Sequence, residues 1–193
     1  MAANAAASAA QGAADVRAGF VDAIPHLRLF ARSLTRNFVE ADDLVQETML
    51  KALANIDRFE PGTKLRPWLF TIMRNTFYSD LRKRRREVQD VDGEHAARLV
   101  TGQRQDSSVD FDDFKRAFAQ LHSDHREVLT LIGASGCSYE EAANICGCAV
   151  GTIKSRVNRA RRRLEEIMSG AAGGDGETTP DTGTMQGAIA GNW

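Results

Sequence analysis

The stretch that decides the fold lies in the last third of the chain, at residues 138–156: SYEEAANICGCAVGTIKSR. Ser138 and Glu141 have the S-x-x-E spacing of a capping box, in which each side chain accepts a hydrogen bond from the other residue's backbone N–H at a helix start. Gly147 stands where a helix commonly ends in a left-handed residue. The stretch therefore predicts two short helices around a glycine turn. This is the layout of a helix-turn-helix, whose second helix enters the major groove of DNA.

The second of these helices is strongly basic. Between residues 152 and 163 it has no acidic residue, and its cations are Lys154, Arg156, Arg159, Arg161, Arg162 and Arg163. A basic helix alone is often a solvated surface, and a capping box alone only starts a helix. Because both features occur together around one glycine turn, DNA binding is the favoured interpretation.

Charge is segregated along the chain. The 193 residues carry 25 Lys plus Arg and 26 Asp plus Glu, a formal net charge of −1. The bulk composition therefore would not suggest a nucleic-acid-binding protein. Acidic residues gather at 40–47 and 106–113, whereas cations gather at 82–86 and 154–163. Local fields determine where a polyanion binds, so the two basic segments are the candidate sites.

Other chemistries have little support in the sequence. The cysteines and two nearby histidines lack the paired spacing of a zinc site or a disulfide framework, so we expect small buried thiols in a reducing cytosol. These residues are Cys137, Cys146, Cys148, His122 and His125. With no Gly-rich phosphate loop and no histidine paired with a nucleophile, we expect no catalytic residue, cofactor or metal. No apolar run approaches membrane-spanning length, and the Ala-rich start lacks a basic leader, so we expect a soluble, cytoplasmic protein.

Helical periodicity dominates the chain and no strand-like alternation persists, which predicts an all-α fold. At 88–110, Asp, Gly, Gln and Ser replace the periodic apolar pattern. We interpret this segment as a flexible linker between two small helical domains, at 18–87 and 111–168. The Ala-rich segment 1–17 and the Gly-, Thr- and Ala-rich segment 169–193 are predicted to be disordered tails.

The first domain is predicted to contain a helix with an acidic face. Asp42 and Asp43 are expected in its first turn, at the positive end of the helix dipole. Its core-facing residues follow helical spacing and are Val45, Met49, Ala52, Leu53 and Ile56. The opposite face comprises Asp43, Gln46, Glu47 and Leu50. That face could be ordinary solvated surface or a docking surface for a basic partner helix, and the residues alone leave both possibilities open.

A later helix of the same domain carries the first basic segment. Pro67 suits its first turn, and its outer face is expected to carry Arg74 and Tyr78 followed by the cationic run 82–86. Adjacent cations repel one another unless an anion lies nearby. Aromatic rings offer stacking platforms for bases, and cations neutralise phosphates, so this face predicts a single-stranded nucleic-acid site. Phe70 is expected in the core.

The second domain is expected to contain a further helix that packs beneath the helix-turn-helix through Val128, Leu129, Leu131 and Ile132. Ser123 can cap one of its helices, which Gly133 and Gly136 would end. Aromatic residues at helical spacing are usually core, so a core role is predicted for the set Phe111, Phe114, Phe118 and Leu121.

Two cationic sites on separate helical domains, one suited to single strands and one to duplex, resemble the compact extracytoplasmic-function type of bacterial RNA polymerase sigma factor. The motifs behind this resemblance are DDLVQET at 42–48, PWLFTIMRN at 67–75, YEEAA at 139–143 and GTIKSR at 151–156. The run NTFYSDLRKRRRE at 75–87 is similar to the general-stress subgroup, often called EcfG-like. The family would have a region 2-like domain at 18–87 and a region 4-like domain at 111–168.

The resemblance implies a role for three surfaces. Core RNA polymerase would dock on Asp43, Gln46, Glu47 and Leu50. The melted strand of the minus-ten element would bind Asn75, Thr76, Tyr78, Arg82, Lys83, Arg84, Arg85 and Arg86. The minus-thirty-five duplex would bind Thr152, Lys154, Ser155, Arg156, Arg159 and Arg162. The implied function is initiation at general stress promoters, with core RNA polymerase and promoter DNA as partners and an anti-sigma factor as the regulator.

Two other functions fit parts of the sequence. A sigma-like decoy would sequester an anti-sigma factor without binding promoters, but such modules are joined to a phosphoryl receiver domain, and no receiver-sized segment stands here. A conventional repressor would use only the helix-turn-helix, which leaves the acidic face and the arginine run without a role. Both therefore rank below the sigma factor.

Overall fold

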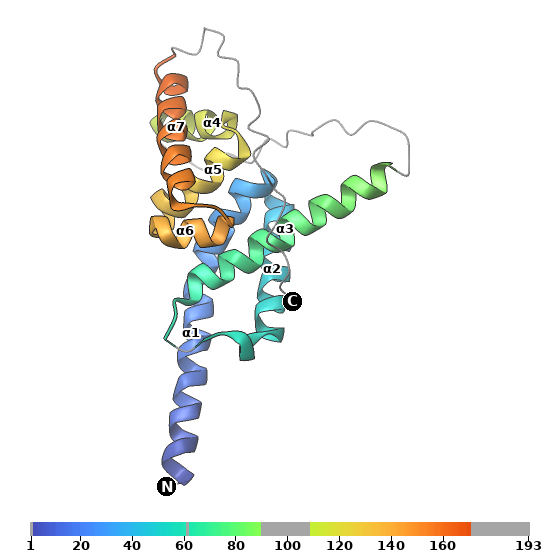
Figure 1. The fold of residues 1–193 in the computed structure, drawn as a ribbon, viewed down its shortest axis with the longest axis vertical. Coiled ribbons are helices and arrows are strands. Elements are labelled where there is room, and N and C mark those ends of the chain that lie inside the picture. Colours follow the sequence, from blue (N-terminus) through green and yellow to red (C-terminus); the bar gives the residue numbers. More distant parts are fainter. Residues whose placement is uncertain (1, 61, 90–108, 171–193) are drawn as a thin grey trace.

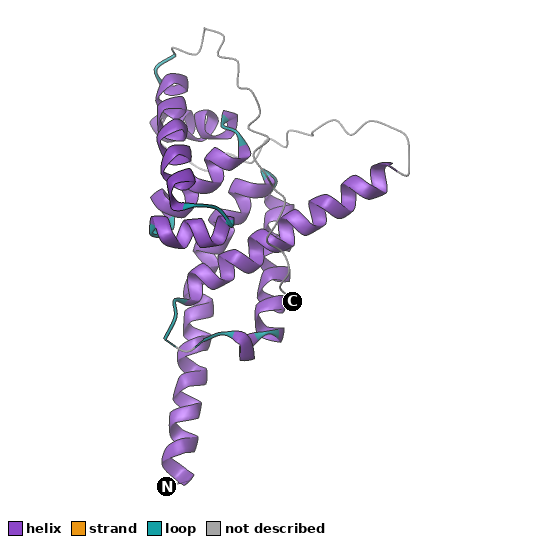
Figure 2. Cartoon of the chain, viewed as in Figure 1, coloured by secondary structure: helices purple, strands orange, loops and turns teal. Residues whose placement is uncertain are grey.

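The computed structural model describes residues 2–60, 62–89 and 109–170, and every regular element in these ranges is helical (Figure 1, Figure 2). In chain order the elements are α1 (Ala2–Thr35), α2 (Phe38–Ala54), the 3-10 turn η1 (Ile56–Arg58), α3 (Leu65–Gln89), α4 (Val109–Gln120), α5 (Ser123–Leu129), the π-helical turn η2 (Thr130–Ala134), α6 (Tyr139–Cys146) and α7 (Val150–Met168). The all-α prediction is confirmed. Most of the expected linker at 88–110 and of the expected tail at 169–193 lies outside the described residues.

The first three helices form one bundle. Leu27 and Phe30 of α1 and Leu69 and Phe70 of α3 are fully buried. The rings of Phe30 and Phe70 meet edge to face, with their centroids 5.0 Å apart, a geometry that adds a favourable aromatic contact to the burial of apolar surface. The expected core position of Phe70 is confirmed, and α2 packs on both neighbouring helices.

The helix-turn-helix has the expected local geometry. The Ser138 hydroxyl accepts a hydrogen bond from the Glu141 N–H at 3.1 Å, and the Glu141 carboxylate accepts one from the Ser138 N–H at 2.8 Å. Gly147 then ends α6 with φ 65° and ψ 40°, a left-handed conformation that glycine adopts at little cost. The second bundle packs around this unit through Val128, Leu131, Ile145, Ile153 and Val157.

The capping box gives a stability prediction. Replacing Ser138 with alanine removes an N-cap acceptor, so we expect the free energy of unfolding to fall by about 1 kcal/mol. Urea denaturation followed by circular dichroism would measure this difference. The matched control is Ser79→Ala, at an exposed helical position, where alanine should be neutral or slightly stabilising. Equal losses in the two variants would show that the cap contributes nothing specific.

Two helices begin earlier than the sequence predicted. The expected disordered tail at 1–17 is helical from Ala2, in keeping with the high helix propensity of its alanines. Helix α2 begins at Phe38, because the side chain of Asn37 caps it and accepts a hydrogen bond from the Val39 N–H at 2.9 Å. The prediction that Asp42 lies in the first turn is therefore wrong, since Asp42 falls in the second turn.

The start of α5 and the surface of α4 also differ from expectation. Ser123 is the first residue of α5 rather than its cap, which is His122, whose Nδ1 accepts from the Asp124 N–H at 3.3 Å. The core prediction for two phenylalanines of α4 is wrong, because Phe111 is 50% and Phe114 is 37% exposed. Leu121, the fourth member of the predicted set, lies just beyond the end of α4 and is 2% exposed, so its core position is confirmed. Helix α4, which contacts α7, buries Ala117.

The two bundles pack directly against each other. Helix α3 contacts α6, and α1 contacts both α5 and η2, so buried residues of both bundles belong to one hydrophobic cluster. The C-terminal half of α3 instead projects away from this body (Figure 1). The closed arrangement thus covers the first half of α3 and leaves its basic end in solvent.

Candidate nucleic-acid and partner-binding surfaces

The acidic face lies on α2. Asp43, Gln46 and Leu50 are exposed, and the half-buried Glu47 forms an ion pair with Lys51 at 2.7 Å. Leu53 was predicted to face the core, but it is 55% exposed and lies one turn from Leu50, which is 69% exposed. An exposed leucine pair beside carboxylates suits a partner that offers both apolar and basic side chains.

A groove runs beside this face, between α2 and α3. Carboxylates line it from both helices, namely Glu40, Asp43, Glu47 and Asp80, together with Phe77, Leu81 and Arg84. Arg84 is the lining cation, and its guanidinium lies 3.9 Å from the Glu40 carboxylate. The groove is therefore acidic along α2 and becomes basic toward the end of α3.

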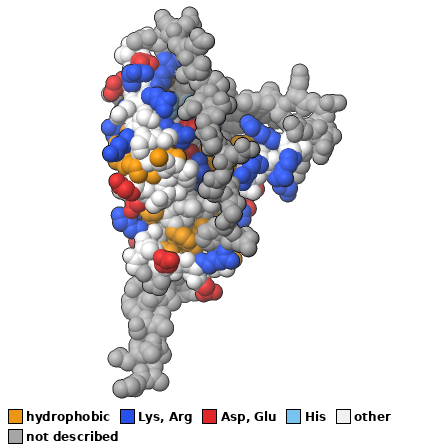
Figure 3. All heavy atoms as spheres, in the orientation of Figure 1, with side chains coloured by type: hydrophobic (Ala, Val, Ile, Leu, Met, Phe, Trp, Pro, Cys, Tyr) orange, Lys and Arg blue, Asp and Glu red, His pale blue; other side chains and the backbone are white. Residues whose placement is uncertain are grey.

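The basic end of α3 forms the expected cationic surface. Residues 82–86 are all exposed, and Figure 3 shows their Lys and Arg side chains gathered on the projecting part of the molecule. Asn75 is also exposed, nearer the domain body. Because this part of α3 is covered by no other described helix, an extended polyanion can reach it from several directions.

Two residues predicted for the same surface lie elsewhere in this arrangement. Thr76 is 3% exposed, and its hydroxyl accepts a hydrogen bond from Lys51 Nζ at 3.2 Å. Tyr78 is half-buried at the boundary of the two bundles, where its hydroxyl donates to Glu127 at 3.3 Å. The structure thus brings Asn75 and the 82–86 run to solvent and keeps Thr76 and Tyr78 in internal contacts.

Helix α7 carries the second cationic surface. Ile153, Val157 and Ala160 are buried, which turns the opposite side of the helix toward solvent. Lys154, Ser155, Arg159 and Arg162 are exposed and Thr152 is partly exposed. Figure 3 shows cations gathered along this helix as well.

Several of these side chains already have polar partners. Arg159 donates to the Ser155 hydroxyl at 3.3 Å, and Arg162 pairs with Glu166 at 3.6 Å. Arg156 is less accessible than the others, because its side chain is 25% exposed and lies 3.5 Å from the Asp124 carboxylate. A duplex would have to displace these exposed pairs, which costs little because such surface contacts are weak.

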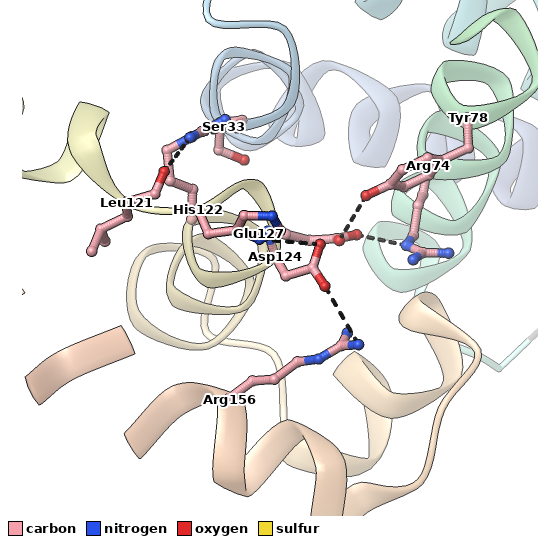
Figure 4. A network of polar contacts seen from close by, with 9 residues as sticks. Ser33, Arg74, Tyr78, Leu121, His122, Asp124, Glu127 and Arg156 are labelled. Atoms are coloured by element: carbon pink, nitrogen blue, oxygen red, sulfur yellow. Dashed lines mark hydrogen bonds and ion pairs between the residues drawn. The ribbon is translucent and has the colours of Figure 1, made fainter. Parts of the chain in front are cut away.

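The junction between the bundles contains buried charges that sequence reasoning missed. Glu127 of α5 is 1% exposed, and its carboxylate accepts hydrogen bonds from Arg74 Nε at 2.6 Å and from the Tyr78 hydroxyl at 3.3 Å (Figure 4). The neighbouring Arg126 is 4% exposed and donates to the carbonyl of Ser33 at 3.0 Å. Both α5 residues therefore take partners from the first bundle.

The burial of this cluster shifts its pKa values. Burial raises the pKa of the Glu127 carboxyl, against the opposing effect of the Arg74 charge. Burial, the largest effect, would lower the pKa of Arg74, but the charge and hydrogen bond of Glu127, together with the smaller effects of Cys146 and Tyr78, give a net upward shift. Burial, followed by the charge of Glu127, raises the pKa of Tyr78. Because Arg74 and Glu127 are in contact at 2.6 Å, we interpret them as an ion pair. The Tyr78 phenol beside them is neutral.

The cysteines behave largely as expected. Cys137 and Cys146 are buried free thiols, and Cys148 is half-buried. Burial raises the pKa of Cys137 to about 11 and also raises the pKa of Cys146 and of Cys148. In the described ranges, no group of three His, Cys, Asp or Glu side chains is arranged to hold a metal ion. No helix there has the length and apolar character needed to cross a membrane.

Two known protein families match this chain, one over each bundle. Residues 20–87 match the family Sigma-70 region 2, and residues 111–164 match the family Sigma-70, region 4. The chain is 54% identical over 177 residues to "ECF RNA polymerase sigma factor EcfG" of Rhodopseudomonas palustris (strain TIE-1), covering 92% of this chain and 96% of that protein. It is 40% identical over 125 residues to "ECF RNA polymerase sigma factor SigC" of Mycobacterium tuberculosis (strain CDC 1551 / Oshkosh), covering 64% of this chain and 68% of that protein.

A solved structure is similar over both bundles. The sigma factor RpoE from Bartonella quintana, crystallised in complex with the anti-sigma factor NepR, has a TM-score of 0.72 to this chain. The two sequences are 53% identical, and the match covers 80% of this chain and 97% of the other.

Proposed function

Because the chain belongs to the extracytoplasmic-function (ECF) family of RNA polymerase sigma factors, we propose that it directs core RNA polymerase to promoters of general stress genes under the control of an anti-sigma factor. In this proposal, residues 18–87 dock on the polymerase and bind the melted minus-ten element, and residues 111–168 bind the minus-thirty-five element. The polymerase supplies the catalytic centre, and the sigma factor supplies only binding. Such a factor works in the cytoplasm, where promoters and polymerase meet.

The observation that carries this proposal is the distribution of charge over three separate surfaces. The α2 face with Asp43 and Glu47 is acidic, whereas the end of α3 and the solvent side of α7 are basic. A protein that only bound DNA would have no use for an exposed acidic face with a leucine pair. Electrostatic complementarity therefore assigns α2 to a protein partner and the two basic surfaces to DNA.

The proposed regulation by an anti-sigma factor is supported by a similar protein. The similar RpoE was crystallised with the anti-sigma factor NepR, and the identity of 53% extends across both bundles. We expect an anti-sigma factor to bind this chain in the same way. The general stress role rests on the identity of 54% to the EcfG protein.

The test is run-off transcription with purified core RNA polymerase, the chain and a pool of promoter fragments. Specific transcripts should require the chain, and the variant Asp43→Lys with Glu47→Lys should reduce them at least about 30-fold, because about 2 kcal/mol of interface energy is lost. The variant Asp22→Lys with Glu60→Lys is the matched control, since both residues are exposed in the first bundle outside the acidic face.

The result separates the sigma factor from the decoy. A decoy that sequesters an anti-sigma factor would give no transcripts and no binding to core polymerase. If transcription persists after charge reversal on α2, the chain is still a sigma factor, but its polymerase-docking surface lies on another helix.

A further inference from the structure

We propose that Arg74 and Tyr78 form a nucleotide-binding pair for single-stranded DNA, and that Glu127 occupies this pair in the closed arrangement. The inference rests on the proposed function, because it extends the predicted single-strand surface along α3. It makes Arg74 and Tyr78 one binding unit of that surface and assigns Glu127 the role of an internal competitor. Binding of a strand to the pair then requires the two bundles to separate.

The pair has the chemistry that a nucleotide requires. The guanidinium carbon of Arg74 lies 4.6 Å from the centroid of the Tyr78 ring, so the cation and the ring form one unit. An arginine can hold the oxyanion of a phosphate as it holds a carboxylate, and a phenol ring can stack on a base. The Glu127 carboxylate, 2.6 Å from Arg74 Nε, thus lies where a phosphate oxygen would bind.

The position of the pair along α3 supports the same interpretation. Residues four apart share one face of a helix, and Arg74, Tyr78, Arg82 and Arg86 follow one another at this spacing. Arg82 and Arg86 are exposed, whereas Arg74 and Tyr78 are half-buried at the junction and bind Glu127 of α5. Separation of the two bundles would therefore lengthen the exposed cationic face by two helical turns toward the N-terminus of α3.

Helix α5 also pairs with the other basic surface. Asp124 lies one turn from Glu127, and its carboxylate is 3.5 Å from Arg156 of α7 (Figure 4). The two carboxylates of α5 thus bind one cation from each of the two basic helices. One short helix thus carries a carboxylate for each of the two basic surfaces. This is the arrangement expected of a segment that competes with DNA.

The contacts that close the junction permit opening. A buried ion pair gains little net stability, because desolvation offsets its attraction. The bundles share a hydrophobic cluster and the buried hydrogen bond from Arg126 to the Ser33 carbonyl. Their other polar contacts have exposed or half-buried side chains: Arg36 to the Ala119 carbonyl at 2.7 Å, Arg66 to the Ser135 carbonyl at 3.2 Å, and Lys64 to Glu141 at 2.8 Å. Each of these exposed polar contacts is weak. A polyanion that binds the released cations can therefore replace them.

The first experiment measures binding of the full chain, without polymerase, to a fluorescein-labelled oligothymidine by fluorescence anisotropy. Glu127→Gln keeps the size of the side chain and removes its charge, so we expect the affinity to rise at least about fivefold. The double variant Glu127→Gln with Arg74→Gln should return to the wild-type affinity or below. The control Lys64→Gln removes a charge from an exposed ion pair and leaves Glu127 on Arg74 and Tyr78, so it should change the affinity less than twofold.

Unchanged affinity in Glu127→Gln, or an equal gain in the double variant, would overturn the proposal. The second measurement needs no variant: hydrogen exchange of the wild-type chain should accelerate in α5 when the oligothymidine is added, and equal exchange with and without it would also overturn the proposal. Both measurements omit polymerase, so they are independent of the transcription test, and either proposal can fail alone.

Discussion

Replacing Lys154 and Arg159 with glutamate should abolish promoter-directed transcription while leaving binding to core polymerase intact. Both side chains are exposed on the solvent side of α7, opposite the buried Ile153 and Val157. Each lost contact to a base or phosphate is worth about 1–3 kcal/mol, so promoter affinity should fall about 100-fold or more. The new negative charges add repulsion from the phosphate backbone.

Affinity measured over a range of salt concentrations distinguishes this loss from misfolding. The slope of log affinity against log salt should become shallower by about two, because two phosphate neutralisations are removed. The matched control is Arg116→Glu with Arg163→Glu, which reverses two exposed arginines of the same bundle outside the proposed DNA-binding set. If both double variants lose affinity equally, the field of the whole bundle, rather than the face of α7, accounts for binding.

The helix-turn-helix could be predicted because its signals are local. The capping box of Ser138 and Glu141 and the left-handed Gly147 are formed within a few residues, and backbone chemistry alone favours them. The start of α2 has an equally local signal in Asn37, which caps the helix. That signal was overlooked in favour of Asp42, because carboxylates suit the first turn of any helix.

Burial was harder to predict than helicity. The spacing of Phe111, Phe114 and Phe118 identifies a stripe on a helix, but it does not show whether another helix covers that stripe. Helix α4 contacts α7 and buries Ala117, and the three rings stack on one another with centroids 6.4 and 5.8 Å apart, which leaves Phe111 and Phe114 exposed.

The junction could not be found from sequence patterns. Arg74 and Glu127 are 53 residues apart in the chain, and each stands in a helix where a charged residue normally indicates solvent. Periodicity places Arg74 on an outer face of its own bundle, which is correct for that bundle alone. Only the packing of the second bundle turns this outer face into a buried one.

Replacing Arg82 and Arg85 with glutamate should prevent promoter opening without weakening duplex binding through α7. Both residues lie on the projecting, exposed end of α3, distant along the chain from the recognition helix. Contacts to a melted strand are worth about 1–3 kcal/mol per base, so the fraction of opened promoter should fall at least about tenfold. Fluorescence of 2-aminopurine placed in the minus-ten element reports this opening directly.

A template with a pre-opened minus-ten bubble provides the control. Opening then carries no base-pairing cost, so transcription by the double variant should recover to within about threefold of the wild type, the remaining deficit reflecting lost phosphate contacts. In a separate measurement, binding of the double variant to an isolated minus-thirty-five duplex should match that of the wild type. A loss that is equally severe with the bubble would mean that the cationic run acts in polymerase docking or duplex binding. The arginines of α3 are exposed beside the acidic groove of α2, so the bubble template separates strand capture from docking.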